Sequence, residues 1–97
     1  MNRLVLSAAL VERGGLRSTP AGVPVLDLAL KHESQLGEAG LVRSVSMHMK
    51  AIAIGEITRT LAAMTLGQVG IFAGFLAAAR NGRGLLFHVT TVDLPAA

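Results

Sequence analysis

The segment Arg80-Asn81-Gly82-Arg83 places two arginines around an Asn-Gly pair, between the apolar runs 69–79 and 85–91. Asn-Gly between apolar runs predicts a hairpin with a type I′ turn, because both residues accept the positive φ that this turn requires. A guanidinium is a permanent cation whose N–H groups match phosphate oxygens. The expected hairpin tip therefore predicts an anion-binding site. The alternative is that arginines occur at turns simply because turns are solvated.

Further basic residues lie in other segments of the chain. Nine Lys and Arg residues stand against six Asp and Glu residues, which gives a formal net charge of +3. Arg13 and Arg17 lie within residues 12–22, a segment rich in glycine and polar residues that is typical of a loop. Arg43 and Lys50 lie in residues 42–54, a segment in which polar and apolar residues alternate. This charge balance favours an anionic partner only weakly, so the fold must decide which cations act together.

No catalytic or metal-ligating motif is present in the sequence. The absence of cysteine excludes disulfides, thiolate metal sites and cysteine nucleophiles, and it is compatible with a reducing cytoplasm. His32, His48 and His88 lack the spacing of a zinc site. No carboxylate pair or serine stands in a catalytic motif. We therefore predict a binding protein that is not an enzyme and that uses no cofactor and no metal.

Five segments have the pattern of strands, and one has the pattern of a helix. We expect strands over residues 3–11, 23–31, 42–54, 69–79 and 85–91, and a helix over residues 56–64. Residues 33–40 are polar and punctuated by glycine, so we expect them to connect strands rather than pack.

Alternation within residues 42–54 separates two faces of the third expected strand. The apolar face holds Val45, Met47 and Met49, and the alternation also places Arg43 on this face. The polar face, which is either solvated or a ligand surface, holds Ser44, Ser46, His48 and Lys50. We expect the two methionines in the core of the protein.

Aromatic residues are scarce, since the chain has three phenylalanines and neither Trp nor Tyr. We expect Phe72, Phe75 and Phe87 to lie in the core, because each stands within an apolar run. Few aromatic side chains are therefore available to stack nucleic-acid bases.

Residues 60–79 carry no charge and contain a Gly70-xxx-Gly74 spacing, so a membrane helix is a rival interpretation. Gln68 beside Gly67 and the absence of interfacial Trp and Tyr argue against it. We instead expect Gly67 to end the helix and a glycine-interrupted strand to begin at Val69. No association with a membrane is predicted.

Five strands with one short helix between the third and fourth are the element order of the OB-fold, a small barrel that binds oligonucleotides. We therefore predict an all-β fold, with residues 1–97 forming one OB-fold domain. On that topology the basic residues of two loops and of the third strand lie where such barrels hold a nucleic-acid strand.

Several short motifs, in order along the chain, resemble a known family. These motifs are Asn2-Arg3-Leu4-Val5-Leu6-Ser7, Pro20-Ala21-Gly22-Val23-Pro24, Glu38-Ala39-Gly40 followed by Arg43, and Gly74-Phe75 with Asn81-Gly82 before Leu86-Phe87-His88. Together they are similar to the primosomal replication protein N (PriB) family, relatives of bacterial single-stranded DNA-binding protein. The resemblance implies a cytoplasmic homodimer that binds single-stranded DNA. It also implies action in replication restart with the primosomal helicase and other primosome proteins.

The resemblance also predicts the site and its weaknesses. Leu41 and Ser46 stand where better-known family members place aromatic residues, so we expect weaker, more salt-sensitive binding. The expected nucleic-acid-binding residues are Arg13, Arg17, Arg43, Ser46, Lys50, Arg80 and Arg83. The alternative is a protein–protein adaptor that contacts the helicase and binds DNA only weakly.

Overall fold

The computed structural model describes residues 1–95, which form six strands and one helix. The strands are β1 (Leu4–Arg13), β2 (Arg17–Ser18), β3 (Pro24–Glu38), β4 (Leu41–Ile54), β5 (Val69–Ala78) and β6 (Leu85–Asp93), and the helix is α1 (Ile57–Ala63). The two-residue β2 lies in the loop after β1 and was not expected. The last two residues of the predicted domain, 96–97, lie outside the described residues.

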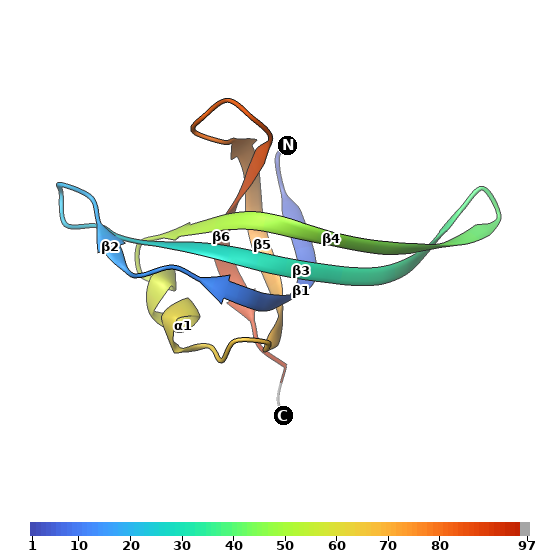
Figure 1. Cartoon of the computed structure of the whole chain (residues 1–97), viewed down its shortest axis with the longest axis horizontal. Coiled ribbons are helices and arrows are strands. Elements are labelled where there is room, and N and C mark those ends of the chain that lie inside the picture. Colours follow the sequence, from blue (N-terminus) through green and yellow to red (C-terminus); the bar gives the residue numbers. More distant parts are fainter. Residues whose placement is uncertain (96–97) are drawn as a thin grey trace.

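Five of these strands close into a barrel (Figure 1). Their order is β1-β5-β6-β4-β3, and β3 pairs back to β1. All of these pairs are antiparallel except that of β4 with β6, which is parallel. α1 lies between the third and fourth barrel strands, as expected. This all-β topology is consistent with the OB-fold.

The barrel interior is filled by alternate residues of the strands, because successive side chains of a strand point to opposite faces. Phe72 and Phe87 are fully buried beside Leu30, and α1 adds Leu61 and Met64 to the same cluster. Phe72 and Phe87 thus occupy the core, as expected.

Phe75 is not in the core, contrary to expectation, and is 39% exposed. It lies three residues after Phe72, so the alternation of β5 turns it to the outer face of the barrel. Met47 and Met49 are partly buried against the core, as expected. The apolar run around Phe75 was misleading because β5 carries small and apolar residues on both of its faces.

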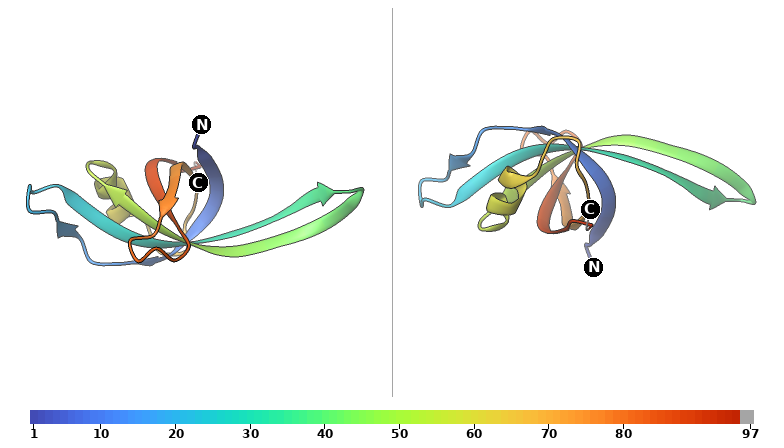
Figure 2. Two further views of the ribbon diagram at one scale, coloured as in Figure 1. Left: turned by 90° about the horizontal axis from the view of Figure 1, so that it is seen from above. Right: turned by 90° about the horizontal axis from the view of Figure 1, so that it is seen from below.

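β3 and β4 continue beyond the barrel as a long two-stranded arm (Figures 1 and 2). Their pairing runs unbroken from Val25 with Ile54 to Glu38 with Leu41. The prediction that residues 33–40 form a connection is wrong, because only residues 39–40 form the turn. The strands of the arm are exposed to solvent on both faces and need no apolar side. Residues 33–38 are therefore mostly polar, and a polar segment in the sequence resembles a loop. Ala39 and Gly40 have φ of 53° and 78°, as a type I′ turn requires.

The loop 79–84 joins β5 to β6, as expected, but its turn is of another kind. The Gly82 N–H donates to the Ala79 carbonyl at 2.8 Å, and Gly82 has a φ of 73°. Asn81 does not have the positive φ expected of it. Its Oδ1 instead accepts a hydrogen bond from the Arg83 N–H at 2.9 Å. The loop is longer than the two-residue hairpin connection for which a type I′ turn is needed.

The uncharged run 60–79 is divided between two elements, as expected. α1 ends at Ala63, earlier than expected, because Met64 already has an extended backbone with ψ of 146°. Gly67 does not end the helix, contrary to expectation: it has a φ of 90° in the connection three residues beyond Met64, and β5 begins at Val69. Within residues 1–95, no helix is long and apolar enough to cross a membrane.

Candidate nucleic-acid interface

A groove of about 460 Å³ opens on the outer side of the barrel, between the loop after β1 and the loop 79–84. Arg17 and Thr19 line it on the side of the first loop, and Ala78 and Arg80 line it on the other. The remaining lining residues, from β3, β4 and β6, are Val25, Asp27, Ile52, Ile54, Leu86 and His88. Two of the predicted cations, from separate loops, therefore face one groove.

A second hollow of about 400 Å³ continues this groove, since Asp27 and Leu86 line both. Lys50 lines the second hollow from β4. It lies on the polar face of β4 that alternation predicted, and it is exposed. The structure thus brings Arg17, Lys50 and Arg80 to one continuous surface.

Arg17 is paired with Asp27 inside the groove. The Arg17 Nη2 donates to Asp27 Oδ2 at 2.9 Å, and the Arg17 Nε donates to the same oxygen at 3.1 Å. The two side chains are 53% and 55% exposed. Exposed ion pairs contribute at most about 1 kcal/mol, so a phosphate can replace Asp27 as the partner of Arg17 at little cost.

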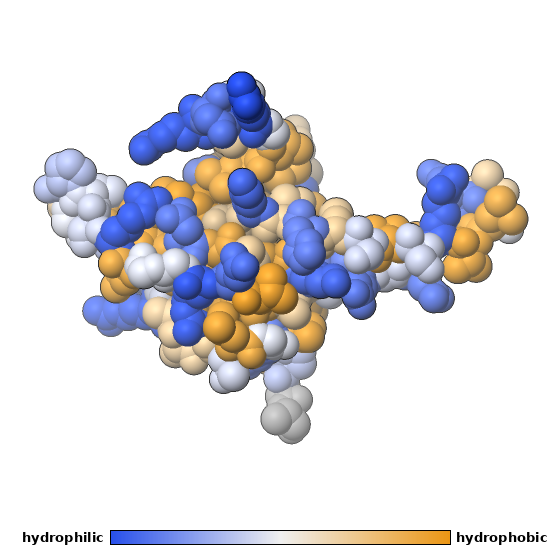
Figure 3. Space-filling model, in the orientation of Figure 1, coloured by the Kyte–Doolittle hydropathy of each residue, from blue (hydrophilic) through white to orange (hydrophobic). Residues whose placement is uncertain are grey.

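Lys50, Arg80 and Arg83 take part in none of the ion pairs formed within residues 1–95. All three residues are exposed. Figure 3 shows the loop 79–84, at the top of the view, as a strongly hydrophilic projection. These charges are therefore not neutralised locally and are available to a ligand.

Arg13 is directed away from the groove and toward α1. Its Nη1 donates to the carbonyls of Leu61 at 3.1 Å and Met64 at 2.6 Å. These carbonyls lie at the C-terminal end of the helix, where a cation is favourable. Since Arg13 is partly buried in this arrangement, it lies outside the surface formed by Arg17, Lys50 and Arg80.

Arg43 and Ser46 lie on the arm, on opposite faces of β4. Arg43 forms an ion pair with Glu38 near the tip of the arm. Ser46 shares the outer face with Lys50, about 13 Å further along the strand at 3.3 Å per residue. Ser46 therefore lies on the same face of β4 as Lys50 but lines neither hollow of the groove, and Arg43 lies on the opposite face.

Two residues with rings near the groove, Phe75 and His88, are absent from the predicted nucleic-acid-binding residues. His88 lines the groove, and its ring stacks on Phe75, with centroids 4.7 Å apart. Alternation in residues 86–89 was the available signal, because Phe87 and Val89 are buried and His88 therefore faces outward.

Comparison with known proteins places this chain in a family. Residues 2–91 match the family described as "Another single-strand binding protein family". The replication restart protein PriB of Bordetella pertussis (strain Tohama I) is 48% identical over 81 residues, which is 84% of this chain and 76% of that protein. The chain belongs to the PriB family. The resemblance seen in the sequence motifs is therefore confirmed.

A second PriB relative, from Photorhabdus laumondii, is 35% identical over 97 residues, covering 96% of this chain and 92% of its own length. The solved structure of PriB from Ralstonia solanacearum has a TM-score of 0.87 and 37% identity, and the match covers 97% of each chain. The barrel, the arm and the loop 79–84 thus belong to a fold shared along nearly the whole chain.

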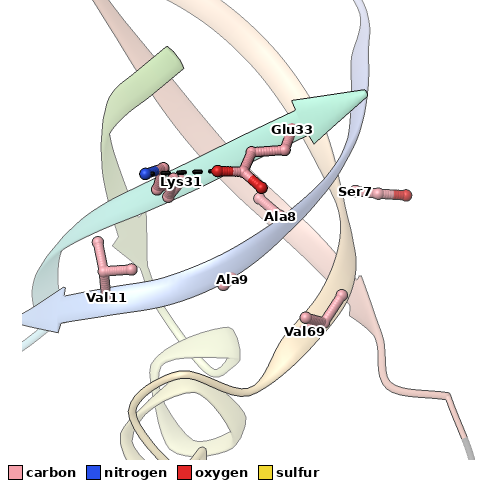
Figure 4. A pocket seen from close by; sticks show the side chains of 7 residues that line it. All are labelled: Ser7, Ala8, Ala9, Val11, Lys31, Glu33 and Val69. Carbon is pink, nitrogen blue, oxygen red and sulfur yellow. Dashed lines mark ion pairs between the residues drawn. The ribbon is translucent and has the colours of Figure 1, made fainter. Parts of the chain in front are cut away.

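A separate hollow of about 250 Å³ lies on the outer side of β1, β3 and β5 in this PriB family member (Figure 4). Ala9 and Val11 line it from β1, and Val69 lines it from β5. The Lys31 Nζ lies 3.4 Å from Glu33 Oε1, in an ion pair between two residues of β3 that line the hollow. None of the predicted nucleic-acid-binding residues lines this hollow.

β1 has an open edge beside this hollow. Residues 4–8 pair only with β5, because pairing of β1 with β3 begins at Ala9. The His32 Nδ1 lies 2.5 Å from the Ser7 carbonyl oxygen on that edge. Open edges of this kind pair readily with a strand of another chain.

Proposed function

We propose that this protein binds single-stranded DNA as an accessory protein of the replication-restart primosome. The observation that carries the proposal is the groove in which Arg17 and Arg80, from loops on opposite sides, face each other above β3, β4 and β6. Membership of the PriB family supports the same function. The protein acts in the cytoplasm, where replication forks restart.

Binding depends mainly on contacts from basic side chains to phosphates. Arg17, Lys50, Arg80 and Arg83 form the proposed contact set, and Ser46 extends the path of the strand onto the arm. Such contacts carry no sequence information, so the protein accepts strands of any sequence. Arg13 is not included, because its guanidinium is held by helix carbonyls. Arg43 lies outside the groove and supplies at most a contact at the end of the arm.

The double substitution Arg80→Ala with Arg83→Ala tests the phosphate contacts. Each single-strand phosphate contact contributes about −0.7 to the slope of log K against log salt, so the variant should lose roughly 1.4 of that slope. Anisotropy of labelled oligo-dT across a salt series measures it. Arg59→Ala is the matched control, because Arg59 is an exposed arginine on α1 that lines neither hollow of the groove. An unchanged slope in the double variant would remove this loop from the site.

The protein acts as a homodimer in this proposal. The open edge of β1 at residues 4–8 is a suitable place for a second copy to add its own β1, because its backbone groups there lack a strand partner within residues 1–95. The molar mass in solution should then correspond to two chains. A mass of one chain at micromolar concentration contradicts the dimer but leaves the groove unaffected.

A protein–protein adaptor is the second candidate function, and one observation favours it. The tip of the arm carries Leu36, Leu41 and Val42 with 58%, 69% and 75% exposure, visible as a hydrophobic end at the right of Figure 3. Exposed apolar patches mark contact sites for proteins. In this alternative the arm contacts the primosomal helicase, and oligo-dT binds only at low salt. Affinity for oligo-dT near physiological salt separates the two functions.

A further inference from the structure

Phe75 and His88 form a stacked pair on the outside of the barrel. They are register partners on β5 and β6. Their ring centroids are 4.7 Å apart, and the ring planes differ by 9°. Parallel rings at this separation hold each other in a fixed orientation, so His88 is presented as a flat, supported surface.

This pair is not needed to fill the core. Phe72 and Phe87 occupy the interior and are fully buried, whereas Phe75 is 39% exposed. His88 lines the groove, and Phe75 does not. His88 is therefore the ring that a ligand in the groove meets, and Phe75 supports it from the side away from the groove.

The stacked pair completes a row that crosses the outer side of the barrel. Strand register places Asp27, Ile52, His88 and Phe75 side by side on β3, β4, β6 and β5. With neighbouring strands about 4.8 Å apart, His88 lies roughly 10 Å from Asp27, the residue to which Arg17 is paired. Arg80 lines the same groove. A ring that can stack a base thus lines the same groove as two cations that can hold phosphates.

We propose that His88, supported by Phe75, is the base-stacking platform of the groove. This inference rests on the proposed single-strand binding and adds where the bases lie. Base stacking needs a flat π-face and is indifferent to sequence, which an imidazole in this setting provides. The bases then lie over β6, between the loops. Where the strand continues onto the arm its bases are not stacked, because Leu41 and Ser46 offer no ring.

The proposal is tested with oligo-dT that carries one 2-aminopurine, whose fluorescence falls when it stacks. The chain has neither Trp nor Tyr, so protein emission does not interfere. The unaltered protein should quench the probe on binding. It should also bind oligo-dT more tightly than an abasic oligonucleotide of the same length, by roughly fivefold or more.

Four variants separate stacking from charge. His88→Ala should abolish both the quenching and the preference for oligo-dT over the abasic strand, whereas His88→Phe should retain both. Phe75→Leu should reduce both, because Phe75 is a positioning residue for the His88 ring. His48→Ala is the matched control, since His48 is an exposed histidine on the outer face of β4 that lines neither hollow of the groove.

Each outcome decides one part of the proposal. Equal affinity of the unaltered protein for oligo-dT and the abasic strand overturns the platform but leaves single-strand binding intact. Quenching that survives in His88→Ala and disappears in His48→Ala moves the bases to the arm and also overturns it. Absence of any binding by the unaltered protein overturns both the platform and the proposed function. If His88→Ala does not fold, Phe75→Leu decides instead, and unchanged quenching with an unchanged preference for oligo-dT over the abasic strand in that variant overturns the platform.

Discussion

Arginines with the same sequence signal have different neighbours in the folded chain. Arg13 and Arg17 both lie near the loop after β1, yet one is bound to helix carbonyls and the other faces the groove. Which is which depends on where β1 ends relative to α1, and no local pattern carries that information. Charge and turn composition thus identify both arginines as candidate phosphate ligands. Only the tertiary contacts show which of them lines the groove and which one binds the end of α1.

Arg13→Ala should lower the free energy of unfolding by about 1–2 kcal/mol, because it removes two hydrogen bonds from the carbonyls at the end of α1. For a chain of this size the melting temperature should fall by roughly 4–15 °C. The salt slope of oligo-dT binding should not change. Thermal unfolding followed by circular dichroism and an anisotropy series measure the two effects. A loss of slope with an unchanged melting temperature would return Arg13 to the binding site.

At the scale of elements, the strands and the helix follow from alternation and glycine placement, but their extents do not. β3 continues through residues 33–38 because β4 pairs with it, and a pairing partner is not visible in the pattern of one segment. The bulge in β6, which lies opposite residues 73–74, likewise depends on the pairing of two strands and cannot be predicted from one segment. Gly74 permits that bulge, since a Cβ there would lie 1.7 Å from the His88 carbonyl oxygen.

Gly74→Ala should therefore lower the free energy of unfolding by about 3 kcal/mol or more, because the backbone of β6 must move to admit a methyl group. Gly37→Ala is the matched control in β3, where nothing lies within 4 Å of an added Cβ. Urea denaturation of the two variants measures the difference. Equal stability of the two variants would mean that the bulge relaxes without cost.

At the scale of the whole molecule, the groove of the proposed function depends on strands that are distant in sequence. The groove forms because β6 pairs with β4 in parallel, which places Leu86 and His88 beside residues of β3 and β4. Local patterns predicted the elements, and their order along the chain predicted the barrel that combines them. The stacked ring pair was missed because Phe75 was assigned to the core and His88 was judged only as a possible metal ligand.

The measurement that tests the central claim most directly is the anisotropy of labelled oligo-dT, single-stranded against duplex of the same length, at two salt concentrations. The account predicts clear preference for the single strand and a marked loss of affinity at the higher salt, because basic side chains of the groove bind phosphates. Equal binding of duplex and single strand would contradict it. No binding near physiological salt would also contradict it and would favour the adaptor.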